Sequence, residues 1–171
     1  MDSQKANPHQ SSLRQDLFEL LLKLSILIVV GCFSFIFIFG VVIAPDDSMS
    51  PAVNPGDIAV YYRLGKTYAV DDVVVVSINK EKQIRRIMAA PGDVVEIRDK
   101  GLYVNGNLHV VADKEILPYV KGPKYPLKLG PNQYFVMGDY VTGVSDSRKY
   151  GVVDQSQLLG RLTVLIRGKR F

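Results

Sequence analysis

The segment Gln83–Asp93, QIRRIMAAPGD, decides how the fold is interpreted, because it sets two adjacent arginines between apolar residues just before a Pro-Gly turn. Neighbouring side chains of a β-strand point to opposite faces, so either Arg85 or Arg86 must face the interior or a cleft. A buried guanidinium costs free energy unless a partner compensates its charge. The segment therefore predicts a strand that carries one arginine with a specific role.

The rest of the C-terminal part also predicts short strands, rich in Val, Ile and Tyr and separated mostly by Gly or Pro. These strands are Ile58–Tyr62, Val73–Ile78, Ile84–Met88, Val94–Ile97, Leu102–Val104, Tyr134–Met137 and Leu162–Ile166. Asn105-Gly106 predicts a type I′ hairpin turn. Residues 111–132 hold several prolines and lysines and predict a long excursion, whose role the sequence leaves open. No segment after Ala44 shows a sustained helical period, so we expect a mainly β body.

Residues 24–44, LSILIVVGCFSFIFIFGVVIA, contain no charged side chain. As a helix, this run reaches about 31 Å, which is enough to cross the hydrocarbon layer of a membrane. Pro45 directly after Ala44 argues against a cleaved signal peptide, while a buried soluble helix is the remaining alternative. We therefore predict a cytoplasmic tail over residues 1–23, a transmembrane anchor over 24–44, and an extracytoplasmic β domain over 45–171.

The charge distribution limits the partners that the chain can have. Lys5, Arg14 and Lys23 precede the anchor, and the positive-inside rule then favours a cytoplasmic N-terminus and a C-terminal domain outside the plasma membrane. The formal net charge of +4 suits an anionic membrane surface, and no basic run with interleaved aromatics predicts nucleic-acid binding. Cys32 is the only cysteine, which excludes an intramolecular disulfide and a cysteine metal cluster.

Ser48 follows the anchor, on a predicted loop before a strand. A loop serine alone says little, and a Ser-His-Asp triad is poorly supported, because His9 falls in the tail and no acidic partner is suggested for His109. The order of four motifs says more. They are Ser48-Met49-x-Pro51, Gly56-Asp57-Ile58, Arg86-Ile87 leading into Pro91-Gly92-Asp93, and Met137-Gly138-Asp139 followed by Asp146-Ser147-Arg148.

This ordered set resembles the type I signal peptidases of bacteria, in their compact Gram-positive form, from the anchor to the C-terminus. The resemblance implies a signal-peptidase-type antiparallel β domain after one transmembrane helix, membrane lipid as a partner, and no cofactor or metal. Members of the family cut signal peptides after Ala-x-Ala sequences that are presented as extended strands. A serine attacks the scissile carbonyl, and a lysine kept neutral by burial accepts its proton.

On this resemblance, Ser48 takes the nucleophile position and Arg85 takes the position of the lysine. Arginine has a pKa of about 12.5–13.8, so it stays protonated and cannot act as a general base near neutral pH. Lys82 is a poor substitute, because its offset places it on the opposite strand face, in an expected turn. The expected substrate-binding residues are Asp46, Asp47, Met49, Asp57 and Ile58. The expected structural residues are Arg86, Gly92, Asp93, Gly138, Asp139, Asp146 and Arg148.

Two further departures from the family concern the same chemistry. Val144 stands where the family has a serine that hydrogen-bonds the lysine. Asp46 and Asp47 stand where the family's residues help to form the oxyanion hole, in which one donor contributes ~3 kcal/mol. Arg85 is then either a neutral substitution on a solvated strand or, as the sharper hypothesis, the partner of Asp46 or Asp47 in an ion pair.

The leading functional hypothesis is a signal-peptidase-like pseudoenzyme that binds secreted or pilus proteins as a chaperone or assembly factor. Its pilus role rests on likeness to signal-peptidase-like proteins encoded in Gram-positive pilus loci. The alternative is an active type I signal peptidase, a serine endopeptidase in which Ser48 works with an unusual base. A membrane-tethered β domain such as a sensor has no specific support. The sequence leaves the client and the oligomeric state open.

Overall fold

The structure is a computed structural model that describes residues 8–98, 101–109, 121–140 and 142–168, with side chains described from residue 13 onward. The chain divides into two compact units, one that ends at Ile38 and one that begins at Phe39, and each is described by itself.

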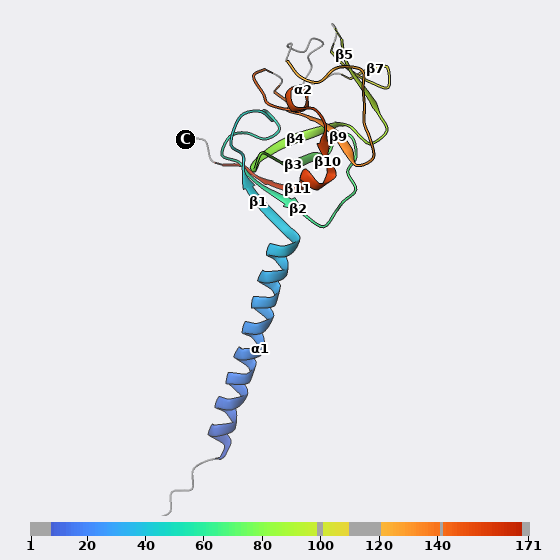
Figure 1. Cartoon of the computed structure of the whole chain (residues 1–171). Coiled ribbons are helices and arrows are strands. Elements are labelled where there is room, and N and C mark those ends of the chain that lie inside the picture. The colour runs from blue at the N-terminus through green and yellow to red at the C-terminus, as the bar shows by residue number, and fades with distance from the viewer. Residues whose placement is uncertain (1–7, 99–100, 110–120, 141, 169–171) are drawn as a thin grey trace, which may run out of the picture. The chain divides into compact units, whose positions relative to one another are not determined.

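The first unit contains one long helix, α1 (Pro8–Ile38), which is blue in Figure 1. Proline suits the first helical position, because the first turn has no use for its missing N–H. The 26-residue segment Leu13–Ile38 contains an 18-residue stretch with a mean hydropathy of 2.6. At about 39 Å, it is long enough to cross a membrane.

The end of α1 differs from the helix expected over residues 24–44. The helix ends at Ile38, and the next five residues form strand β1 (Phe39–Ile43), which pairs along its whole length with β2 (Ile58–Tyr62). Aromatic and β-branched residues suit a strand, and the ladder with β2 supplies the hydrogen bonds that helical continuation would have given. The division into tail, anchor and outer domain stays a prediction.

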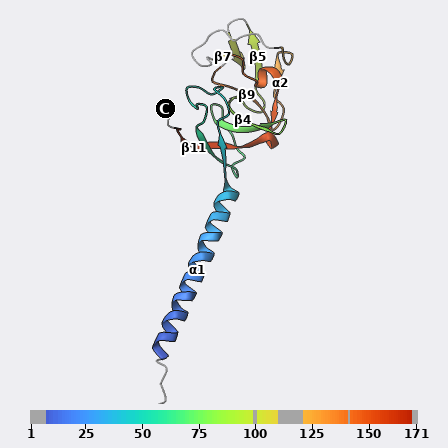
Figure 2. The ribbon, with the colours of Figure 1, turned by 90° about the vertical axis from the view of Figure 1, so that its left-hand side faces the viewer.

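The second unit contains two antiparallel sheets (Figures 1 and 2). The seven-stranded sheet has the order β1, β2, β11 (Leu158–Ile166), β3 (Val73–Ile78), β4 (Glu81–Ala89), β9 (Gln133–Met137) and β10 (Val153–Asp154). The four-stranded sheet has the order β7 (Asn107–His109), β6 (Gly101–Val104), β5 (Val94–Arg98) and β8 (Leu127–Lys128). Two short helical elements, α2 (Ser147–Tyr150) and η1 (Gln155–Gln157), follow β9 and precede β11.

All seven predicted strands are confirmed, and the mainly antiparallel β class with them. Asn105 and Gly106 have φ values of 51° and 81°, as the predicted type I′ turn requires. The excursion predicted over residues 111–132 lies partly outside the described residues, since 110–120 are not among them. Its described part contains the short strand β8, which the sequence did not predict.

The core consists of three buried clusters, of which two support the site. One cluster joins the two sheets through residues such as Phe135 and Leu102. Another lies beneath the loop between β1 and β2, where Met49, Val53 and Ile84 pack together. This packing fixes the loop that carries Ser48 against β4.

Candidate functional site

The loop over residues 44–57 holds Ser48 against the turn that follows β9. The Tyr140 N–H donates to the Ser48 carbonyl over 2.9 Å, and Met49 beside it is only 2% exposed. A Cβ on Gly138 would lie 2.6 Å from the same carbonyl oxygen, so only glycine permits this close approach. The structure thus brings together two motifs that are about 90 residues apart.

Arg85 is the inward-facing member of the arginine pair in β4, and it is 2% exposed, while Arg86 is half-buried. Its Nη1 donates to Ser48 Oγ over 2.7 Å and to the Ile84 carbonyl over 2.6 Å. Its Nε and Nη2 donate to the Ser145 carbonyl over 3.2 and 2.9 Å. The residues predicted at the nucleophile and lysine positions therefore touch each other.

The hypothesis that Arg85 pairs with Asp46 or Asp47 is wrong. The three oxygens that bind its guanidinium are neutral, both aspartates are exposed, and the described part of the chain shows no ion pair between them. Asp46 turns back on its own backbone, where its Oδ1 accepts from the Ser48 N–H over 3.0 Å. Such local side-chain-to-backbone bonds are typical of aspartate in turns. The burial of Arg85 also contradicts the solvated-strand alternative.

The bond from Ser48 to Asp46 affects the chemistry that the site can perform. An oxyanion is stabilised by donors aimed at the developing charge. Here the backbone N–H of Ser48 is already bound by a carboxylate, and that negative charge would oppose an oxyanion at the same place. Only a displacement of the Asp46 side chain would free this donor.

Among the described residues, no side chain accepts a hydrogen bond from Ser48 Oγ. Arg85 is the hydrogen-bond partner of Ser48 Oγ within the described residues, and it acts as the donor. Tyr150 lies close enough for the positive charge of Arg85 to affect it, but burial dominates and raises its pKa to about 12, so the phenol is neutral at pH 7. Lys82 is exposed in β4, not in the expected turn, since the turn is formed by Asn79 and Lys80 with positive φ values.

The expected structural residues form two carboxylate–arginine pairs. Asp139 accepts from Nε and Nη2 of Arg86 over 2.8 and 2.7 Å, and this hydrogen bonding raises the pKa of Arg86. Asp146 accepts from Nε and Nη2 of Arg148 over 2.9 and 2.8 Å in a fully buried pair. Both pairs support the turns that surround Ser48 and leave Arg85 as the buried arginine without a carboxylate.

The remaining predicted residues are scattered around this centre. Asp57 is 4% exposed and accepts from the Asn54 and Gly168 backbone N–H groups, whereas Ile58 is exposed. Gly92 forms the Pro-Gly turn with a φ of 95°, and Asp93 accepts from the Ala90 N–H. The assignment of Asp46, Asp47, Met49, Asp57 and Ile58 to substrate binding stays a prediction.

The sequence reasoning missed Ser145 and Tyr150. Ser145 binds Arg85 through its backbone carbonyl, so no side-chain pattern could reveal it. Tyr150 lies in α2, which is too short to give a helical period. The position of each beside Arg85 depends on how the chain turns after β9.

Exposed aliphatic side chains lie at both ends of the Ser48 loop. Ile43 precedes the loop, Ile58 follows it, and the two pair across β1 and β2, with Ile166 opposite Ile58 in β11. The next row contains Val41, Val60 and Val164, and most of these residues are more than a third exposed. We call this surface the aliphatic rows: Ile43, Ile58, Ile166, Val41, Val60 and Val164.

Comparisons with known proteins agree with the motif order. The model of the family "signal peptidase, peptidase S26" matches residues 17–166. Signal peptidase I S of Bacillus subtilis (strain 168) is 29% identical over 138 residues, which are 72% of this chain and 74% of that protein. Signal peptidase I of Bacillus licheniformis is 25% identical over 167 residues, 86% of this chain and 87% of that protein.

Among solved structures, a signal peptidase I from Enterococcus faecalis V583 is 25% identical, with a TM-score of 0.43, and covers 57% of this chain and 97% of its own. The family assignment rests on the sequence match, which spans most of the apolar helix and nearly the whole β unit. That match, together with one apolar helix long enough to cross a membrane, indicates a single-pass membrane anchor. The chain therefore belongs to the signal peptidase family, peptidase S26.

Proposed function

We propose that this protein binds extended segments of secreted or pilus proteins without cleaving them, and acts as a chaperone or assembly factor. In this proposal, α1 anchors it in the plasma membrane with the N-terminus in the cytoplasm and the β unit outside. The observation that carries the proposal is the 2.7 Å hydrogen bond from Arg85 Nη1 to Ser48 Oγ. A donor occupies the place where a peptidase needs a proton acceptor.

The chemical argument follows the proton. When Ser48 Oγ attacks a carbonyl, it must lose its proton as the new C–O bond forms. A protonated guanidinium has no free lone pair with which to accept that proton. Tyr150 is also protonated at neutral pH, because its pKa is about 12. With Arg85 on Ser48 Oγ and Asp46 on the Ser48 N–H, the attack would lack both a base bonded to the hydroxyl and a free oxyanion donor.

Binding can persist where cleavage is lost, because the two depend on different groups. The aliphatic rows offer exposed apolar area at both ends of the Ser48 loop, and apolar area suits the hydrophobic stretches of secretory precursors. The strand β1 is the edge of the seven-stranded sheet, and an edge can pair with an extended segment. These features support a peptide-holding surface and require no proton transfer.

An active peptidase is the second candidate, and one observation favours it. Ser48 keeps its hydroxyl in a fixed position, whereas a purely structural site could do without it. In this case a water molecule or a group on the substrate would have to accept the proton. The two candidates differ in whether turnover depends on Ser48.

The decisive experiment compares cleavage and binding in the same preparation. The full chain in liposomes is mixed with a precursor that carries an Ala-x-Ala site, beside the Ser48→Ala variant. We expect no cleavage above the Ser48→Ala background, and equal co-flotation of the precursor with both proteins. Cleavage that disappears in Ser48→Ala would establish the peptidase, and the absence of precursor binding by either protein would refute the chaperone role.

A repair series tests the proposed cause of inactivity. Arg85→Lys alone should remain inactive, because Val144 still gives the lysine no hydrogen-bond partner and Asp46 still occupies the Ser48 N–H. Combined replacement with Arg85→Lys, Val144→Ser and Asp46→Ser should produce measurable cleavage. Activity from Arg85→Lys alone would show that the missing base was the sole defect.

A further inference from the structure

A charged hollow lies beside the loop that carries Ser48, and neither the chemistry of Ser48 nor the aliphatic rows involve it. Its volume is about 550 Å³. We call it the arginine hollow, and it is lined by Pro51, Ala52, Arg86, Asp139 and Arg167. Pro51 is three residues after Ser48 on the same loop, so the hollow begins at most about 11 Å from Ser48. Asp139 precedes Tyr140, whose N–H binds the Ser48 carbonyl.

The two arginines of the hollow differ in how their charges are compensated. Arg86 forms a bidentate pair with Asp139, in which Nη2 lies 2.7 Å from Oδ2, and its Nη1 donates to the Asp71 carbonyl over 2.9 Å. Arg167 is exposed, and within residues 8–98, 101–109, 121–140 and 142–168 no carboxylate forms an ion pair with it. The lining therefore contains two cations and one carboxylate, which leaves it with one positive charge.

The backbone on both sides of Arg167 is held in place, although its side chain is exposed. Ile166, directly before it, pairs with Ile58 in the ladder between β11 and β2. The Gly168 N–H, directly after it, donates to Asp57 Oδ1 over 3.1 Å, and Asp57 is only 4% exposed. A cation on a fixed backbone loses less conformational entropy on binding than a cation on a loose chain. Arg167 is thus suited to recognise a partner of opposite charge.

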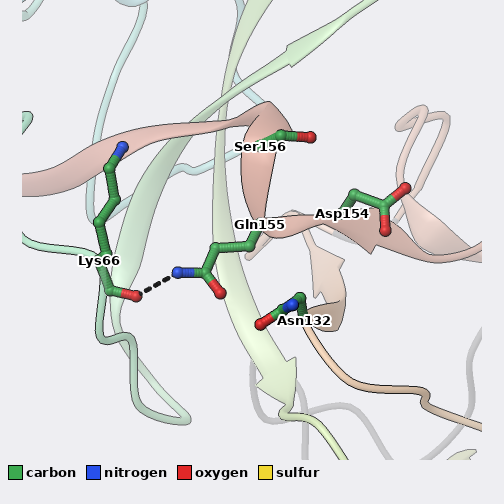
Figure 3. Close-up of a pocket in the computed structure, with 5 residues that line it drawn as sticks. All are labelled: Lys66, Asn132, Asp154, Gln155 and Ser156. Carbon is green, nitrogen blue, oxygen red and sulfur yellow. Dashed lines mark hydrogen bonds between the residues drawn. The ribbon is translucent and has the colours of Figure 1, made fainter.

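A hollow of about 490 Å³ beside η1 offers a comparison (Figure 3). Its lining also includes a cation and a carboxylate, Lys66 and Asp154. Gln155 Nε2 donates to the Lys66 carbonyl over 2.7 Å, and Figure 3 shows the Lys66 ammonium extending away from the Gln155 amide and from Asp154. None of its lining residues belongs to the loop that carries Ser48. Lys66 is therefore an exposed cation that can act as a control for Arg167.

We propose that the arginine hollow selects clients with an acidic side chain, whose carboxylate binds the guanidinium of Arg167. Arginine suits this role, because its planar donors match the two oxygens of a carboxylate. An extended peptide advances about 3.3 Å per residue, so the acidic residue is about three positions from the residue that lies over Ser48. This inference rests on the proposed peptide-holding function and adds the class of client that the site prefers.

The experiment measures the binding of fluorescent peptides to the full chain in detergent. Each peptide has an Ala-x-Ala centre and an amidated C-terminus, so that one glutamate supplies the only carboxylate. The glutamate is moved through four positions on each side of the centre, and every peptide has a counterpart with glutamine. We expect glutamate to bind about fivefold more tightly than glutamine, as in a partly exposed ion pair, at one or two adjacent positions on one side. Elsewhere the two should bind equally.

Three variants assign this preference to the hollow. Arg167→Gln should abolish it, whereas Lys66→Gln, which also removes an exposed cation, should retain it. Arg167→Glu should reverse it, so that a lysine at the same peptide position binds more tightly than glutamine. A variant that had merely lost its fold could not acquire this opposite preference.

The glutamine peptides measure peptide holding alone, so the inference and the proposed function can fail separately. Equal binding of glutamate and glutamine peptides at every position overturns the inference and leaves the peptide-holding function standing. Equal loss of the preference in Arg167→Gln and Lys66→Gln overturns it as well, because the attraction would then come from the overall charge of the protein. If no peptide binds, the proposed function fails and the inference fails with it.

Discussion

Two buried arginines of this molecule are held in opposite ways. Arg148 is 1% exposed and forms a bidentate pair with the carboxylate of Asp146. Arg85 is 2% exposed and is bound by Ser48 Oγ and two backbone carbonyls, all of them neutral. The charge of Arg148 is thus compensated inside the fold, whereas the charge of Arg85 remains beside the nucleophile position.

The two arginines therefore have different roles: Arg148 belongs to the structural scaffold, whereas Arg85 belongs to the candidate site. Removing one partner of a buried ion pair leaves the other charge uncompensated and is strongly destabilising. Removing a cation that has no carboxylate takes away a desolvation cost along with its hydrogen bonds. The stability of the protein should therefore depend much more on Arg148 than on Arg85, although the two are equally buried.

The largest expected effect is that of Arg148→Met. It leaves the Asp146 carboxylate buried without its partner, and we expect a loss of about 3–5 kcal/mol in the free energy of unfolding. Urea unfolding of the full chain in detergent measures it. The control is Arg98→Met, whose pair with Glu96 is largely exposed, and which should cost below about 1 kcal/mol. Equal losses in Arg148→Met and Arg98→Met would show that the buried pair contributes no more to stability than the more exposed one.

The second prediction concerns Gly138, which contacts both the buried Asp146–Arg148 pair and the loop that carries Ser48. Its N–H donates to Asp146 Oδ2 over 3.3 Å, and its Cα faces the Ser48 carbonyl. Gly138→Ala places a methyl group 2.6 Å from that oxygen, so we expect a loss of about 1–3 kcal/mol on the same urea measurement. Gly31→Ala in α1, where no atom lies within 4 Å, is the control and should not destabilise the chain.

The third prediction is a pH dependence that arises from Tyr150. Burial raises its pKa from 10.0 to about 12, and the nearby positive charge of Arg85 opposes this rise. The raised pKa means that the folded state holds this proton more tightly than the unfolded state. The resulting stability is fully present below pH 10 and is lost as the pH rises towards 12.

Tyr150→Phe should remove this loss. At pH 7 the phenol is neutral, so the variant should match the parent within about 1 kcal/mol. Near pH 12 the variant should be more stable by about 1–2 kcal/mol. Urea midpoints of both proteins, measured at pH 7 and near pH 12, test this prediction. If the stability of both proteins falls equally between the two pH values, groups other than Tyr150 control the alkaline transition.

The smallest expected effect is that of Arg85→Met. The change removes a buried cation without a carboxylate but leaves the Ser145 carbonyl without its donors, and we expect a net change of about 1 kcal/mol or less. If Arg85→Met lowered the free energy of unfolding as much as Arg148→Met, Arg85 would be a structural residue and not only the occupant of a former catalytic position.

The strands could be predicted because their local signals agree with their environment. Val73–Ile78 and Ile58–Tyr62 are runs of β-branched and aromatic residues between turns, and their predicted bounds are those of β3 and β2. Asn105-Gly106 determines its own turn, because both residues tolerate positive φ values. In such segments, tertiary structure and local preference favour the same conformation.

The end of the helix could not be predicted from the same signals. Phe39–Ile43 is as apolar as the residues before it, and only its pairing with β2, about twenty residues further along the chain, makes it a strand. The partner of Arg85 was missed for a similar reason. The negative charges of Asp46 and Asp47 made them the expected partners. However, the Asp46 carboxylate binds the backbone of its own loop, which is the locally easier contact, and the Arg85 guanidinium binds backbone carbonyls instead.

The direct passage from α1 into β1 has a practical consequence for anyone who prepares the protein. A soluble fragment that starts at Ala44, the last residue of the uncharged run, would discard the whole of Phe39–Ile43. Ile58–Tyr62 would then become an exposed, apolar edge strand with unpaired backbone groups, which promotes self-association. Fragments that start at or before Phe39 should stay monodisperse where shorter ones precipitate.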